Sequence, residues 1–457
     1  MRIEILNQNY AEYEIFPRVA LLGRETAFTA RGLGIETAWK PDTVYRVKVI
    51  PQEQITTANT HCLGNYSLYE TFDVTSDENG VLRFSYTCTR EQIYAFRVME
   101  AGEGLVWENG INLQIFCAAQ DLFERVPMRG NTHAHASPSP DGHEDPYVAA
   151  SVYRKAGFDY LAITDHHTID GSVLAKRAAE TIPSEMQLYY GEEVHVPNAY
   201  IHAVNVGAVL EGGVGLDRYY HMHEEEVNGI VRKTAEEYAP VLPPELDPVD
   251  YAWRKWIADT IHTHGGVAIV AHPFWNYDAH NTRNDMLRYL AKTKLFDAVE
   301  IVHGQEPDAD EANLQAAYWN DLRAEGIFIP VVGCDDAHRR SYAWNYDSSF
   351  NNAYTVIFAR DPSFEGFREA VCAGYSAAVE SYDNAPLHVI ATYRLTKYTQ
   401  FLLHYYFPYH DSLCFEEGCR MKDAYLGDKE ALETLRRIHG RAAQYSDRFF
   451  GKCRIRK

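Results

Sequence analysis

Histidine and acidic residues recur at the ends of short apolar runs in the middle of the chain. The first are His133 and His135, which stand two residues apart, so both imidazoles point to one side of an extended segment. Imidazoles combined with carboxylates are typical ligands of zinc, manganese and iron. The sequence therefore predicts a centre that binds two or three divalent metal ions. The later members of the set are His166, Glu193, His202, His272, His303, Asp336 and His338.

These residues need a scaffold that brings the ends of several strands together. Apolar runs such as Tyr160–Thr164, Val267–Ala271 and Ala298–Val302 end directly before them and indicate buried strands. Helical segments such as Pro146–Ala156 and Glu311–Glu325 alternate with these runs, which is typical of an α/β domain with parallel strands. In a barrel of parallel strands the carboxyl ends meet at one face. A lone histidine is most often a surface or core residue, but coincidence does not explain such groups at nearly every expected strand end.

The order of the motifs resembles that of one known superfamily. His-x-His at 133–135 is followed by Thr164-Asp165-His166, Gly191-x-Glu193, Ala271-His272-Pro273 and Asp336-Ala337-His338. This series is similar to that of the PHP (polymerase and histidinol phosphatase) superfamily and covers residues 126–385. The resemblance implies a distorted seven-stranded (β/α) barrel and a metal-dependent hydrolase, most often a phosphoesterase. The preceding β domain and the Gly-Asn-x-His-x-His opening look most like the carbaryl-hydrolase branch.

The resemblance also implies a ligand set, carried over position by position. Glu193 matches the carboxylate that bridges metals, and a shared anion lets two cations approach to about 3.5–4 Å. The first metal would be held by His133, His135, Glu193 and Asp336, the second by Glu193, His202 and His272, and the third by His166, His338 and Asp141.

Three of these ligands have a competing neighbour. Along an extended strand one residue faces the site and the next points away. The family spacings Gly-x-Glu and Asp-x-His, and an aspartate beside a glycine, select Glu193, Asp336 and Asp141. The competing residues are Glu192, Asp335 and His143.

The predicted reaction is the hydrolysis of a small phosphate ester by a metal-activated hydroxide. His143 or His303, or alternatively His167, would donate the leaving-group proton. Arg339 and Arg340 would hold a phosphate through paired hydrogen bonds. The same metals can polarise a carbonyl, so a carboxyl ester, amide or carbamate is the alternative substrate. A non-catalytic binding protein is less favoured, because the ligand set is complete.

Three segments flank or interrupt the expected barrel. Residues 1–125 contain short runs rich in β-branched and aromatic residues and predict a β-sandwich without a catalytic role. Residues 212–262 are an insertion that could act as a lid. Residues 386–457 depart from the family pattern and predict a helical extension, with one helix over 428–449.

Composition restricts the partners. The chain of 457 residues has a formal net charge of −21 and no long run of lysine and arginine, which argues against a nucleic-acid partner. No run approaches the roughly 18 apolar residues of a membrane span, and the N-terminus lacks the apolar core of a signal peptide. The eight scattered cysteines are typical of reduced thiols. A cytoplasmic enzyme with a small-molecule substrate is therefore expected, and a homo-oligomer is compatible with the sequence.

Overall fold

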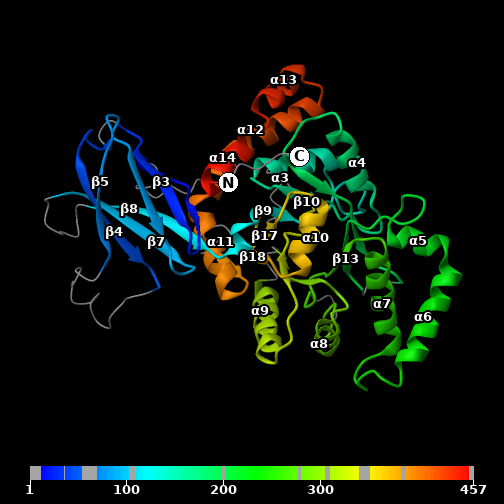
Figure 1. Cartoon of the computed structure of the whole chain (residues 1–457). Helices are drawn as coiled ribbons and strands as arrows, with labels where there is room; N and C mark the ends of the chain where they lie inside the picture. Colours follow the sequence, from blue (N-terminus) through cyan, green and yellow to red (C-terminus); the bar gives the residue numbers. More distant parts are fainter. Residues whose placement is uncertain are drawn as a thin grey trace. The chain divides into compact units, whose positions relative to one another are not determined.

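The computed structural model describes residues 12–34, 37–53, 69–101, 110–197, 201–275, 279–303, 309–338, 350–381 and 387–451. The fold is mixed α/β, and the chain divides into two compact units (Figure 1). Unit 1 comprises the chain up to Arg125, Gln400–His410 and the residues from Gly440 onward, and unit 2 comprises Val126–Thr399 and Asp411–His439. Within the described ranges, no helix is both long and apolar enough to cross a membrane.

Unit 1 is built on two β-sheets that share one core. The smaller sheet has the order β1-β3-β6 and the larger has the order β2-β8-β7-β4-β5. Phe96 packs edge-on against Phe28 and Phe84, with ring centroids 5.3 and 5.2 Å away, so aromatic side chains fill the space between the sheets. The elements are β1 (Tyr13–Phe16), β2 (Val19–Leu21), β3 (Glu25–Gly32), β4 (Val44–Pro51), β5 (Thr71–Thr75), β6 (Leu82–Thr87), β7 (Ile93–Glu100), β8 (Ile111–Ala118) and the short helix α2 (Gln120–Phe123).

The C-terminal segment is divided between the two units. The single helix predicted over 428–449 is wrong, because the chain breaks at Gly440, whose φ of +88° is a left-handed conformation that favours glycine. In unit 1, the ring of Tyr406 stacks on Tyr445 at 5.5 Å, and Arg18 N donates to Phe449 O at 2.7 Å. The elements are β19 (His388–Ile390), α11 (Tyr393–Tyr405), α12 (Phe407–Tyr425), α13 (Lys429–Ile438) and α14 (Arg441–Phe450).

The strands of unit 2 form two mixed sheets. One has the order β11-β10-β9-β17-β18-β19 and the other β12-β13-β14-β15-β16. Neighbours are parallel from β9 to β11 and from β14 to β16, whereas β13 runs antiparallel to both β12 and β14. A single closed seven-stranded barrel is therefore not shown. The strands are β9 (Val126–Asn131), β10 (Tyr160–Ala162), β11 (Gln187–Tyr189), β12 (Gly191–Val194), β13 (Ala203–Val206), β14 (Val267–Val270), β15 (Ala298–Val302), β16 (Val331–Gly333), β17 (Ala353–Ala359) and β18 (Ser376–Glu380).

Two isolated bridges link the sheets just beyond the strand ends. Ala134, after β9, pairs with Ala337, after β16, and His166, after β10, pairs with Glu193 in β12. The backbone N–H of His135 donates to Ala337 O at 3.0 Å. These links bring the ends of strands from both sheets to one place.

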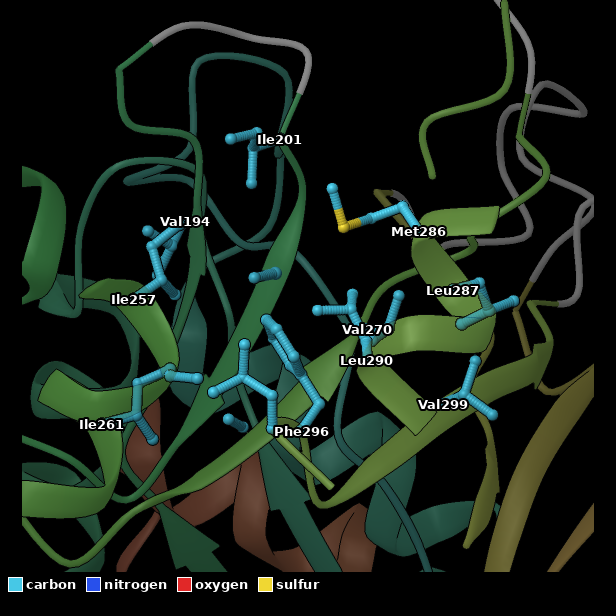
Figure 2. Close-up of a cluster of buried hydrophobic side chains, with 14 of the residues drawn as sticks. Val194, Ile201, Ile257, Ile261, Val270, Met286, Leu287, Leu290, Phe296 and Val299 are labelled. Carbon is cyan, nitrogen blue, oxygen red and sulfur yellow. The ribbon is translucent and has the colours of Figure 1, made fainter. Parts of the chain in front are cut away.

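Helices pack on these sheets through apolar side chains. Ile257 and Ile261 of α7 and Leu290 of α8 lie in one buried cluster with Val270 of β14 and Val299 of β15 (Figure 2). This burial holds the strands whose ends carry the histidines. The insertion folds as α5 (Leu216–Met222), α6 (Glu224–Tyr238) and α7 (Pro248–Thr263), and the other helices of this part are α3 (Pro146–Lys155), α4 (Asp170–Ala179), α8 (Asn284–Thr293), α9 (Ala309–Ala324) and α10 (Phe364–Cys372).

Candidate metal centre

The candidate site lies where strands of both sheets end. His133 and His135 follow β9, and His166 follows β10. Asp336 follows β16 with a φ of +48°, a left-handed conformation that aspartate tolerates better than most side chains. The remaining members of the set are Glu193 in β12, His202 before β13, His272 after β14 and His338 after β16.

Glu193 is the centre of the site. The residue is only 1% exposed, and ring nitrogens face both of its oxygens. Its Oε1 lies 2.7 Å from His202 Nδ1 and 3.2 Å from His272 Nε2. Six imidazoles therefore surround one carboxylate. The four that face Oε2 are His166 (Nδ1, 2.8 Å), His133 (Nε2, 3.2 Å), His135 (Nε2, 3.5 Å) and His195 (Nε2, 3.6 Å).

A second carboxylate completes the first donor set. Asp336 Oδ1 lies 2.9 Å from His135 Nε2 and 3.2 Å from His133 Nε2. With Glu193, these residues offer two nitrogens and two oxygens that all lie within 4.8 Å of one another. Two imidazoles and two carboxylates are a donor set that suits a divalent transition metal.

The second donor set consists of Glu193 Oε1 with His202 and His272. The ring of Trp275 lies beside both histidines, with centroids 5.5 and 5.7 Å away. Because Glu193 contributes one oxygen here and the other to the first set, it stands where a bridging ligand would stand.

The third donor set is centred on Asp141, in the loop after His135. Its Oδ2 lies 3.1 Å from His166 Nε2 and 3.4 Å from His338 Nε2, and Ser139 Oγ donates to its Oδ1 at 2.6 Å. His143 is exposed in the same loop. The loop therefore turns Asp141 toward the two histidines.

The two acidic neighbours that compete with these ligands point elsewhere. Glu192 accepts backbone hydrogen bonds from Leu216 and Asp217 at the start of α5, at 2.6 and 3.2 Å. Asp335 accepts hydrogen bonds from Asn131 Nδ2 and Tyr153 Oη, at 2.5 and 2.7 Å. Both carboxylates serve as internal hydrogen-bond acceptors.

The electrostatics of the site fit bound cations. Burial raises the pKa of Glu193, but the facing imidazoles, led by His133 and His202, hold it well below its ordinary value. Burial, together with the neighbouring His338 and His166, lowers the pKa of His135 to about 3 against the opposing effect of Asp336, which keeps that imidazole neutral and able to bind a metal. Glu193 Oε2 and His133 Nε2 are buried and have no hydrogen-bond partner in the described part of the chain. Such orphaned atoms, aimed at one another, fit divalent metal ions between them.

Two residues of the cluster escaped the sequence reasoning. His195 Nε2 lies 2.7 Å from His166 Nδ1, and the signal for it was its position two residues after Glu193, on the same side of the strand. Glu300 is fully buried in β15, where it contacts His133 and His272. The signal for Glu300 was a single acidic residue inside an apolar strand.

Of the residues predicted to act on the substrate, His303 lies beside the ligand candidate His272. His303 is 1% exposed, its ring centroid is 5.8 Å from that of His272, and its Nε2 lies 3.6 Å from Glu311 Oε2. Arg339 and Arg340 lie outside the described residues.

No family model matches the chain, and no curated protein matches it. Several solved structures resemble it at low identity. A two-domain protein from Bacteroides vulgatus, described as containing a predicted PHP-like metal-dependent phosphoesterase, is 16% identical over 56% of this chain and 65% of its own, with a TM-score of 0.38. The match thus spans slightly less than two thirds of that protein.

Two further solved structures match with similar sequence identity and TM-score. A Bifidobacterium adolescentis protein, assigned by inference as a metal-dependent phosphoesterase, is 16% identical over 54% of this chain and 96% of its own, with a TM-score of 0.34. An amidohydrolase from Chromobacterium violaceum, with bound sulfate and no metal, is 17% identical over 48% of this chain and 89% of its own, with a TM-score of 0.31. None of the three is described as a carbaryl hydrolase. The chain is therefore similar, at this level, to two structures described as metal-dependent phosphoesterases and to one described as an amidohydrolase.

Proposed function

We propose that the protein is a metal-dependent hydrolase that cleaves small phosphate esters. The observation that carries this proposal is Glu193, a buried carboxylate between two donor sets, with a third set beside it. Two adjacent divalent sites on a shared carboxylate are the arrangement used for attack by water on phosphate esters. The two bridged sheets of unit 2 support a distorted barrel of the PHP type as the scaffold.

The proposed ligands are the three donor sets described above. Bound divalent ions would supply Lewis-acid activation of water and offset the negative charge that develops on the ester. The protein supplies the positions of these ions and a buried floor that excludes bulk water. His303 and His143 are the proposed holders of the leaving-group proton, and Arg339 and Arg340 are the proposed phosphate contacts.

The test combines metal analysis with a substrate panel. The purified full-length protein is assayed for bound zinc, manganese and iron, and then for hydrolysis of phosphomonoesters, phosphodiesters, carboxyl esters, amides and carbamates. We expect two or three metals per chain and the highest kcat/KM on a phosphate ester. Activity confined to carboxyl esters, amides or carbamates would mean that the substrate belongs to one of these classes and is not a phosphate ester. Less than one metal per chain after supply of these ions would refute the proposal itself.

A further inference from the structure

Glu300 occupies an unusual position beneath the metal centre. It is fully buried in β15, and its partners in the described part of the chain are two of the candidate ligands. Its Oε1 lies 2.8 Å from His133 Nδ1, and its Oε2 accepts a hydrogen bond from the backbone N–H of His272 at 2.8 Å. One carboxylate therefore joins the end of β9 to the end of β14.

The contact with His133 defines which ring nitrogen is available for a metal. Nε2 of His133 faces Glu193 Oε2 and Asp336 Oδ1, both at 3.2 Å, whereas Nδ1 faces Glu300. A carboxylate at Nδ1 keeps the proton there and leaves the Nε2 lone pair free, and it also increases the basicity of the ring. Glu300 thus faces the ring nitrogen of His133 that is directed away from Glu193 and Asp336.

The contact with His272 fixes a ligand of the second donor set through its backbone. His272 Nε2 lies 3.2 Å from Glu193 Oε1, so its ring position depends on how the chain leaves β14. The hydrogen bond to Glu300 holds that point of the chain. A single side chain therefore acts on both donor sets that share Glu193.

We infer that Glu300 is a positioning residue that sets the affinity of the two metal sites sharing Glu193. This inference rests on the proposed metal centre and deepens it. Asp141, His166 and His338 are not among the contacts of Glu300, so the third site should not depend on it.

Glu192 provides a matched control in the same sheet. Both glutamates are fully buried, and each accepts hydrogen bonds from two N–H donors when His133 carries its proton on Nδ1. The donors to Glu192 belong to α5, whereas those to Glu300 belong to ligand residues. In either glutamine variant the new amide can accept from only one of its two donors, so the local cost is similar.

The experiment is a Co²⁺ titration of metal-free full-length protein, followed by visible absorption, for the wild type, Glu300→Gln and Glu192→Gln. The melting temperature of each metal-free variant is measured in parallel. We expect Glu300→Gln to bind its two tightest ions about 10–100-fold more weakly than Glu192→Gln does, at a comparable melting temperature. Glu300→Asp keeps the charge but is one methylene shorter, and we expect the same direction of change from it. If Glu300→Gln does not fold, the Co²⁺ affinity of Glu300→Asp is the test of the inference.

Two results would overturn the inference while leaving the metal centre intact. One is a Glu300 variant that binds Co²⁺ within threefold of the wild type. The other is equal weakening in the Glu300 and Glu192 variants, which would mean a general effect of strand stability. A wild-type protein that binds no Co²⁺ would instead refute the proposed function on which the inference rests.

Discussion

Unit 2 contains two buried clusters of charged side chains that are neutralised in different ways. In the first, the guanidinium of Arg154 lies 2.6 Å from Glu417 and 3.2 Å from Asp159, so permanent positive charge meets each carboxylate. In the second, Glu193 meets only imidazoles, because all of its ion-pair partners in the described part of the chain are histidines. In the first cluster, each carboxylate therefore has a guanidinium partner from the protein itself.

The second cluster has no guanidinium or ammonium partner for Glu193 in the described part of the chain. An imidazole is neutral when it binds a metal, so six neutral rings would leave the charge of Glu193 buried and unbalanced. In the metal-free protein the balancing charge falls on some of the rings: burial opposes it, but Glu300, Asp336 and Glu193 raise the pKa of His133, and Glu193 and Asp141 raise that of His166 to about 10. Burial, together with His338 and His166, lowers the pKa of His135. The comparison teaches that the number and kind of partners around a buried carboxylate distinguish an internal ion pair from a metal site.

The largest effect should come from removing the shared carboxylate. Glu193→Gln removes the anionic oxygens of two donor sets, so we expect metal affinity to fall by more than roughly 100-fold, beyond the range for groups that act through a ligand. Glu192→Gln should keep its metals, because Glu192 faces α5. Metal content after gel filtration measures both. Equal metal loss in the two variants would contradict the assignment of Glu193.

Disrupting the cluster around Arg154 should lower the stability of the protein and leave its metal content unchanged. Glu417→Ala leaves the buried Arg154 without its nearest anion, so we expect the free energy of unfolding to fall by about 3–5 kcal/mol. Folded protein should still bind its full complement of metals. Urea denaturation measures the change, with the exposed neighbour Glu416→Ala as the control. A loss below about 1 kcal/mol would mean that water replaces Glu417 in this cluster.

The residues that sequence reasoning identified are those whose role is set by local pattern. Alternation along a strand and the family spacings select Glu193 and Asp336, and the structure turns Glu192 and Asp335 to other partners. The N-cap of α3 follows a local rule as well, since Asp145 stands before Pro146 and accepts from the first backbone N–H groups.

The features that sequence reasoning missed include contacts between residues that are distant in sequence. Glu300 acts on His133 across 167 residues, and no spacing within one strand reveals that contact. β13 runs antiparallel to β12 and β14, and the apolar pattern of a buried strand is the same for either direction. The break at Gly440 lies at a glycine inside a helical pattern, a signal that the prediction of one helix did not use.

Added metal should stabilise the protein through the cluster around Glu193, independently of the cluster around Arg154. At a free metal concentration 100 times the Kd of one site, we expect stability to rise by about 2.7 kcal/mol, and EDTA should reverse the gain. Glu417→Ala should gain the same increment, because distant sites contribute additively. Thermal melts with and without Zn²⁺ or Mn²⁺ test this. An increment absent from the wild type would contradict a metal centre.

The third donor set should show a smaller effect, because Asp141 is partly exposed. We expect Asp141→Ala to lose about one metal per chain, through an affinity decrease of roughly tenfold, about 1.4 kcal/mol. His143→Ala should keep all metals and lose turnover by about 10²–10⁴-fold if His143 holds the leaving-group proton. The reverse pattern would exchange their roles, and no effect from either would leave a two-metal site.

The smallest effect concerns an imidazole–carboxylate pair outside the site. His262 Nε2 lies 2.9 Å from Asp297, and the hydrogen bond that the ring donates to that carboxylate raises the pKa of His262 above its ordinary value. Burial raises the pKa of Asp297, but hydrogen bonds from His262 and Ala268 N hold it below its ordinary value on balance. Asp297 thus favours the charged form of the ring, which can serve as the cation of the pair.

The sign of its pH dependence follows from these two directions. The raised pKa of His262 stabilises the fold fully below its ordinary pKa of 6.5, and this contribution is lost as the pH rises through the folded-state value. The contribution of Asp297 is present above its ordinary pKa of 3.8. Because His262 is more than one third exposed, we expect His262→Gln to cost only about 0.3–0.5 kcal/mol at pH 5.5 and close to nothing at pH 9. His264→Gln, two residues on and exposed, is the control in urea denaturation. A cost that grows with pH would mean that the ring pairs with Asp297 in its neutral form.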